Sequence, residues 1–185
     1  LWAARASTRA QRRSSAAPAA ASTAAAGRAV ARPHMNGVGA DMLLLYHDSA
    51  TNLTYGLNAS GRAGSRMTLE ELKTAGHEEM PATGPLSISV PGAVGGWAEG
   101  LRRFGTIPLA QALQPAIRLA EQGLPVSERL AEAIATAEDK LRAEPEATRI
   151  FLPGGAPPEV GSVLPRPDLA ATLRIIQEQG WEEFY

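Results

Sequence analysis

Asn58, Ser60 and Arg62 alternate along the segment Asn58-Ala-Ser-Gly-Arg62, and their types are suited to binding a ligand. In an extended chain alternate residues point to the same side, so these three side chains would share one face. Ala59 and Gly61, which lie between them, are small enough to let a ligand approach the backbone. An arginine fork pairs with a carboxylate through two parallel hydrogen bonds. The segment therefore predicts a carboxylate-binding site, with a surface arginine among turn residues as the alternative.

Other patterns in the chain do not complete a catalytic motif. Gly37-Val-Gly39 resembles the start of a dinucleotide-binding loop, but its glycines precede a predicted strand instead of opening a helix. Ser87 and Ser89 alternate with apolar residues, which is typical of a half-buried strand. The three histidines lie far apart and the chain has no cysteine, so no metal site is predicted. We assign no catalytic residue and no cofactor.

The elements that would position Arg62 come early in the chain. Residues 41–47 and 53–57 read as strands, and the turn residues between them predict a β-hairpin. Residues 86–90 predict a third strand. Thr68 and Glu71 form a capping box, so a short helix is expected to start there and end near Gly76.

Helices dominate the rest of the chain. Apolar residues three and four apart predict helices over 93–104, 108–122 and 168–179, and Ser127 can cap another that runs to about residue 142. Pro115 should kink the second of these helices or split it in two. A Gly/Pro-rich loop is expected over 153–167. This order predicts an α+β fold with helices on one face of an antiparallel sheet, whose further strands lie outside this chain.

Composition and charge limit the number of domains and the kinds of partner that the chain can have. The 185 residues are enough for one domain, or part of a larger one. Residues 1–33 carry six arginines and no acid, whereas the rest carries 12 basic and 19 acidic side chains, a net charge of −7. This acidic body argues against nucleic acid as the main partner. No apolar run approaches the roughly 18 residues of a membrane helix.

The Ala/Arg/Ser-rich stretch 1–33 is expected to be a low-complexity tail, separate from a domain over 34–185. Its alanines bury too little surface to hold a helix in place, which favours disorder. A transit peptide, a nucleic-acid arm and a misread or mis-set gene start are the alternatives. No secretory signal is visible, and the compartment, cytoplasmic or periplasmic, is left open.

Several ordered motifs resemble the gamma-glutamyltransferase (gamma-glutamyltranspeptidase) family. The resemblance covers about 33–185, and its main motifs are Pro33-His-Met-Asn-Gly-Val-Gly-Ala-Asp41, Tyr55-Gly-Leu-Asn-Ala-Ser-Gly-Arg-Ala63 and Gly84-Pro-Leu-Ser-Ile-Ser-Val-Pro-Gly-Ala-Val94. It implies an αββα sandwich of the N-terminal nucleophile hydrolase type and a precursor that cuts itself into two subunits. It also implies that the new N-terminal Thr of the small subunit attacks a gamma-glutamyl amide such as glutathione.

The resemblance places this chain within the large subunit, so the nucleophile is expected outside it. The family's carboxylate-binding arginine falls on Ser60, and Arg62, two residues further on, would substitute for it. The wording Asn58-Ala-Ser-Gly-Arg62 resembles the acylase-like branch of the family. We therefore expect part of a gamma-glutamyltransferase-like enzyme whose partners are a small amide substrate and the missing small-subunit segment. The alternatives are an acylase-like amide hydrolase and a non-catalytic fragment or interaction module.

Overall fold

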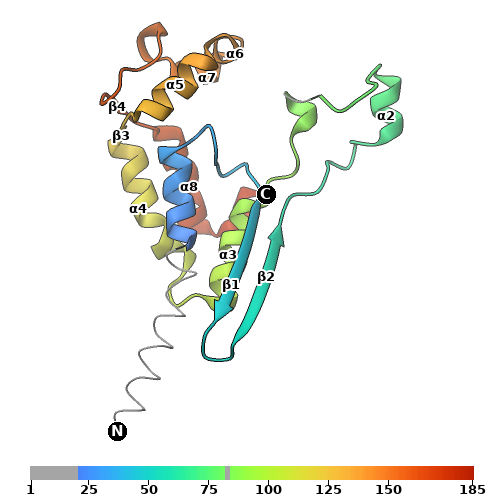
Figure 1. The fold of residues 1–185 in the computed structure, drawn as a ribbon, viewed down its shortest axis with the longest axis vertical. Helices are drawn as coiled ribbons and strands as arrows, with labels where there is room; N and C mark the ends of the chain where they lie inside the picture. The colour runs from blue at the N-terminus through green and yellow to red at the C-terminus, as the bar shows by residue number, and fades with distance from the viewer. Residues whose placement is uncertain (1–20, 82–83) are drawn as a thin grey trace.

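The computed structural model describes residues 21–81 and 84–185. In this part of the chain a two-stranded hairpin packs against one helix, and further helices pack behind that helix (Figure 1). A helix over residues 21–31 comes first. The later elements are β1 (Met42–Asp48), β2 (Leu53–Ala59), α2 (Leu69–Thr74), η1 (Pro85–Ser87), α3 (Ala93–Phe104), α4 (Leu109–Gln122), β3 (Leu124–Pro125), α5 (Glu128–Thr136), α6 (Glu138–Arg142), α7 (Pro145–Phe151), η2 (Pro153–Gly155), β4 (Val163–Leu164), α8 (Pro167–Gln179) and η3 (Trp181–Phe184).

The hairpin has one packed face and one open face. Met42 and Leu44 of β1 face α3, where Gly96 leaves room for the strand: a Cβ on that glycine would lie 2.9 Å from the Met42 sulfur. The intervening residues Leu43 and Leu45 point the other way and are 76% and 81% exposed. A period of two along β1 therefore separates a face that is covered by α3 from an apolar face that nothing in the described chain covers.

The main core lies where α3, α4, α8 and the helix over 21–31 meet. Trp97 of α3 is its largest fully buried side chain, with 1% of its surface exposed. Leu113 of α4 and Leu173 of α8 pack in the same cluster. A second cluster, around Leu130 and Ile134, holds α5 against the chain near β4. Figure 1 shows α5, α6 and α7 gathered at the end of the molecule away from the hairpin turn, and α2 standing apart from the body.

Most predicted elements are confirmed. β1 and β2 form an antiparallel hairpin with Met42 opposite Ala59, and Asn52 in the turn takes a positive φ of 57°. The Thr68 hydroxyl caps α2 by accepting a hydrogen bond from the Glu71 amide at 3.2 Å. Gly123 ends α4 with a φ of 78°. The predicted α+β class, with antiparallel strands early and helices after them, is confirmed.

The structure corrects three predictions. Residues 86–90 do not form a strand. The 3-10 helix η1 covers the first of them, and further on the Val90 amide donates a single hydrogen bond to the Arg62 carbonyl of the same chain (2.8 Å). Pro91 has no N–H to continue a ladder there. The helix that Ser127 begins ends at Ala137, whose φ and ψ of −95° and 6° separate α5 from α6. Of the two effects predicted for Pro115, a split is wrong, because α4 runs through it as one helix, and a kink stays a prediction.

The described part of the Ala/Arg/Ser-rich stretch differs from an unpacked tail. Residues 21–31 are helical, and Ala26, Ala29 and Val30 are buried. Alanine contributes little burial by itself, but here small side chains let the helix lie close to the core that α4 and α8 form. The expectation of disorder missed this tertiary packing. Residues 1–20 lie outside the described part, and the domain boundary near residue 33 stays a prediction.

Two alanines on this helix provide a matched test of its packing. Ala26 has none of its surface exposed, whereas Ala24 is exposed on the same helix. We expect Ala26→Asp to lower the free energy of unfolding by about 3–5 kcal/mol, because it places an unpaired charge in the core. Ala24→Asp has the same helix propensity change and is expected to cost less than about 1 kcal/mol. Equal denaturant midpoints for the two variants would contradict the packed helix.

Candidate functional site

The register of the hairpin brings Asp41 and Ser60 together at its open end. Met42 pairs with Ala59, so the next positions outward, 41 and 60, face each other just beyond the strands. The Ser60 hydroxyl donates to the Asp41 carboxylate at 3.1 Å. This pair lies at the end of the hairpin from which the chain continues to Arg62.

The Asp41 carboxylate accepts hydrogen bonds from three donors. Its Oδ1 accepts from the Gly61 backbone N–H at 2.8 Å and from the Ser89 hydroxyl at 3.3 Å, and its Oδ2 accepts from Ser60. The Gly61 amide is the strongest cause that holds the pKa of the Asp41 carboxyl below its ordinary value, with the two serine hydroxyls acting in the same direction. Asp41 is therefore an ionised acceptor that joins the start of β1, the end of β2 and the segment before α3.

Two of the three predicted binding residues make hydrogen bonds inside this cluster. The Asn58 side-chain oxygen accepts from the Ser60 amide at 2.9 Å, which forms a local turn at the end of β2. The Ser60 hydroxyl is directed to Asp41. Both side chains are exposed, and a role for them in binding substrate stays a prediction. Their observed contacts shape the segment that carries Arg62.

Arg62 is exposed, and within residues 21–81 and 84–185 its guanidinium has no hydrogen-bond or ion-pair partner. Its backbone, in contrast, is held, because its carbonyl accepts the Val90 N–H at 2.8 Å. Gly61 permits this close approach: a Cβ there would lie 1.6 Å from the Val90 carbonyl oxygen. The arrangement is a fixed backbone that carries a free cationic fork, which suits a carboxylate ligand.

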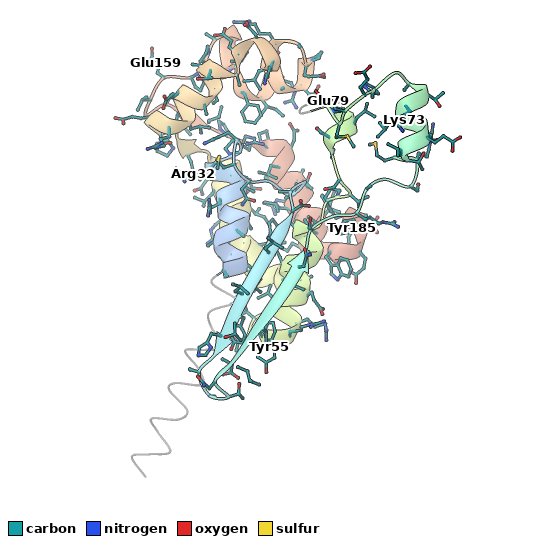
Figure 2. All side chains as sticks on the ribbon, turned by 45° about the vertical axis from the view of Figure 1, so that its right-hand side comes forward. Arg32, Tyr55, Lys73, Glu79, Glu159 and Tyr185 are labelled. Atoms are coloured by element: carbon teal, nitrogen blue, oxygen red, sulfur yellow. The ribbon has the colours of Figure 1, made fainter. Side chains whose placement is uncertain are left out.

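An open cavity of about 780 Å³ lies beside this segment, between the end of β2, α3 and η3. Asn58 lines it, but Ser60 and Arg62 do not. On its α3 wall Glu99 accepts from Arg102 at 2.6 Å and also pairs with Arg103, and these hydrogen bonds lower the pKa of Glu99 to about 2. At the η3 side the Tyr185 hydroxyl accepts the N–H of Gly95, a residue of the cavity wall, at 3.2 Å. Figure 2 labels Tyr185, the residue that follows η3. Of the three predicted binding residues, Asn58 alone therefore lines this cavity, while its side-chain oxygen stays bonded to the Ser60 amide.

Residues 21–81 and 84–185 contain no group of three histidine, aspartate or glutamate side chains placed to hold a metal ion. Over the same ranges, none of the helices is both long enough and apolar enough to cross a membrane.

Comparison with known proteins shows the family. The α+β fold of the chain is that of N-terminal nucleophile hydrolases of the gamma-glutamyltranspeptidase type. A sequence model described as Gamma-glutamyltranspeptidase matches residues 3–185, so this chain belongs to the gamma-glutamyltranspeptidase family. The match begins within the Ala/Arg/Ser-rich stretch.

Solved structures agree with this assignment. The chain superposes on a cephalosporin acylase from Bacillus halodurans with a TM-score of 0.86 and 39% identity, covering 92% of this chain and 33% of that one. It superposes on the gamma-glutamyltranspeptidase of Helicobacter pylori with a TM-score of 0.85 and 28% identity, covering 91% and 49%.

Curated relatives include proenzymes with different named activities. The chain is 38% identical over 167 residues to the oxamate amidohydrolase proenzyme of Klebsiella pneumoniae, which is 87% of this chain and 31% of the relative. It is 32% identical over 160 residues to the glutathione hydrolase proenzyme of Bacillus subtilis, which is 84% and 27%. The chain therefore spans less than a third of the length of these relatives.

Sequence reasoning missed Asp41 as a member of the site. Asp41 was interpreted as the start of a strand. Its hydrogen-bond donors lie 19, 20 and 48 residues further along the chain, so no local pattern reveals them. The hairpin register gives the one usable signal. Once the strands are paired, an acid at position 41 lies opposite a serine at position 60.

Gly61 and Gly64 provide a matched test of the close approach beneath Arg62. We expect Gly61→Ala to lower the free energy of unfolding by about 1–3 kcal/mol, because the new methyl group collides with the Val90 carbonyl and forces two backbones apart. A methyl group added at Gly64 would meet no atom within 4 Å, and this glycine needs no positive φ, so Gly64→Ala should be neutral or slightly stabilising. Thermal and urea unfolding of both variants check this; equal stabilities would contradict the contact.

Proposed function

We propose that this chain is the substrate-anchoring part of an acyl-transfer amide hydrolase, with Arg62 binding a carboxylate of the acyl donor. The names of the two relatives described above support amide or glutathione hydrolysis by a protein made as a proenzyme. The observation that carries the proposal is the Arg62 guanidinium, which has no partner among the described residues and stands on a backbone held from both sides. The remaining two-thirds of such an enzyme would supply the reacting groups.

The nucleophile in this proposal is the N-terminal Thr of a segment outside this chain. Its hydroxyl attacks the amide carbonyl while its own α-amine takes the proton, and the amine portion of the substrate leaves. Water or another amine then releases the acyl group from the Thr oxygen. Arg62 does not take part in these bond changes. It holds the donor by a group remote from the reacting carbonyl, so that the amide meets the nucleophile in a fixed orientation.

The open face of the hairpin supports a partner segment of this kind. Leu43 and Leu45 place two large apolar side chains on a surface that the described helices leave uncovered. A second sheet layer would bury them, as an αββα arrangement requires. The partners we propose are this nucleophile-bearing segment and a small amide substrate with a carboxylate.

Arg62 and Arg66 allow a controlled test in the complete enzyme, obtained by co-expressing this chain with a nucleophile-bearing small-subunit segment. We expect Arg62→Ala to raise KM about 10- to 100-fold with a smaller change in kcat, since a hydrogen-bonded ion pair contributes about 1.5–3 kcal/mol. Arg62→Lys should give an intermediate KM, because it keeps the charge and loses the fork. Steady-state kinetics with a chromogenic gamma-glutamyl amide provide the measurement.

Arg66 is exposed and lies four residues further along the same segment, so Arg66→Ala controls for a general loss of positive charge. Its KM should stay within about twofold of the wild-type value. An unchanged KM for Arg62→Ala would reject the anchoring role. No turnover in any co-expressed pair, with both segments folded, would favour the non-catalytic interaction module.

An acylase-like specificity is the second candidate, and two observations favour it. Ser60 stands where the resemblance places the family's arginine, and its hydroxyl is engaged by Asp41. Over 102 residues the chain is also 44% identical to the acylase ACY 1 proenzyme of a Pseudomonas species. With the cation two residues further on, the site would hold a carboxylate at a different distance from the reacting amide.

A pair of donors separates these two specificities. One is a gamma-glutamyl anilide, and the other is the mono-anilide of glutaric acid, which keeps the chain length and the carboxylate and lacks only the α-amine. The acylase-like candidate predicts a higher kcat/KM for the glutaryl donor, by about tenfold or more, because Arg62 requires only the carboxylate and no group has to bind an ammonium. A preference of that size for the gamma-glutamyl donor would favour the gamma-glutamyltransferase-like reading.

A further inference from the structure

One oxygen of Asp41 bridges the two chain segments that fix the Arg62 backbone. Gly61, directly before Arg62, donates its N–H to Oδ1 at 2.8 Å. Ser89, directly before Val90, donates its hydroxyl to the same oxygen at 3.3 Å. The Val90 amide also donates to the Arg62 carbonyl. Asp41 therefore holds the residue before Arg62 and the residue before Val90, on both sides of that bond.

This cross-link is made beyond the strand ladder of the hairpin. β2 ends at Ala59, so the ladder of the hairpin does not reach Arg62, and the segment before α3 is not a strand. Asp41 and Ser60 are exposed and Ser89 is half-buried, so these hydrogen bonds compete with water. An ionised acceptor makes such bonds roughly twice as strong as a neutral one, so a carboxylate is suited to this position.

We propose that Asp41 is a positioning residue that fixes Arg62, and through it the carboxylate of the bound acyl donor. The inference rests on the proposed function, because it gives Asp41 a role only if Arg62 holds substrate. Asp41 makes no ion pair with Arg62 in the described structure, so it orders the backbone without neutralising the guanidinium.

Two other roles for Asp41 fit the structure less well. A general base needs a free lone pair directed at substrate and a pKa near the working pH. Asp41 has three donors on its two oxygens and a lowered pKa, so it is a weak base. A metal ligand needs companions, and among the described side chains no such group forms.

A double-mutant cycle between Asp41 and Arg62 tests the proposal in the complete enzyme. We expect Asp41→Ala to raise KM about tenfold and to change kcat less than about twofold, because substrate anchoring is weakened and the nucleophile is untouched. In the Arg62→Ala background the same substitution should raise KM by less than about twofold, since the residue through which Asp41 acts is already absent.

Two milder variants keep the test open if Asp41→Ala fails to fold. Asp41→Asn can still accept from Gly61 and Ser89 and can donate to the Ser60 oxygen, so its KM should rise only about two- to threefold. Ser89→Ala removes one donor and should raise KM by a similar factor with little change in melting temperature. A wild-type KM for both variants would overturn the positioning role.

The outcomes distinguish the two proposals. If Arg62→Ala raises KM and the Asp41 variants do not, the positioning role is wrong and the carboxylate site stands. If Arg62→Ala leaves KM unchanged, the site itself is wrong, and the positioning role is rejected with it. If Asp41→Ala raises KM equally in both backgrounds, or lowers kcat alone, Asp41 acts by another route and the proposal is overturned.

Discussion

The carboxylate of Asp41 joins three segments that chain order keeps apart. It accepts from Ser60 and Gly61 at the end of β2 and from Ser89 before α3, while its own backbone leads into β1. The neighbouring carbonyl of Ala40 accepts from the Gly92 and Ala93 amides, at 3.1 and 2.8 Å, and so ties the start of α3 to the same point. The hairpin, the arm that carries α2 and the first turn of α3 therefore meet at one short stretch of chain, and Arg62 lies beside it.

The rest of the described fold provides a rigid support for this junction. α3 presents Gly96 to the hairpin so that strand and helix lie close, and it buries Trp97 on its other side against α4 and α8. A side chain at Gly96 would meet Met42 and Ala59, so this close contact sets how the hairpin lies on α3. The apolar outer face with Leu43 and Leu45 is left uncovered by the described helices, and it is the surface on which we propose that a second layer packs.

Local signals in the sequence predicted much of the fold, and contacts between distant residues account for what they missed. The hairpin, the Thr68 cap and the Gly123 stop each depend on neighbouring residues, and each is present. The strand predicted over 86–90 is absent, because alternating polar and apolar residues favour an extended segment but do not provide a neighbouring strand for it to pair with. The packing of Ala26 depends on α4 and α8, which lie far along the chain, and the three donors to Asp41 are also distant from it in sequence. The sequence motif around Arg62 identified that residue. The hydrogen bonds of Asp41 that hold the neighbouring backbone can be recognised only in the folded chain.

Native-state hydrogen exchange at the Gly61 amide, followed by NMR on the unmodified chain, measures how firmly the Asp41 carboxylate holds this segment. Gly61 lies beyond the last residue of β2, so no strand ladder protects it. The account predicts that its exchange is slowed by more than about tenfold relative to an unstructured chain, because exchange requires breaking its bond to the Asp41 carboxylate. The Val90 amide should be slowed as well, since it is bonded to Arg62. Exchange of Gly61 at the rate of an unstructured peptide would show that the carboxylate does not hold this segment, and would contradict the account.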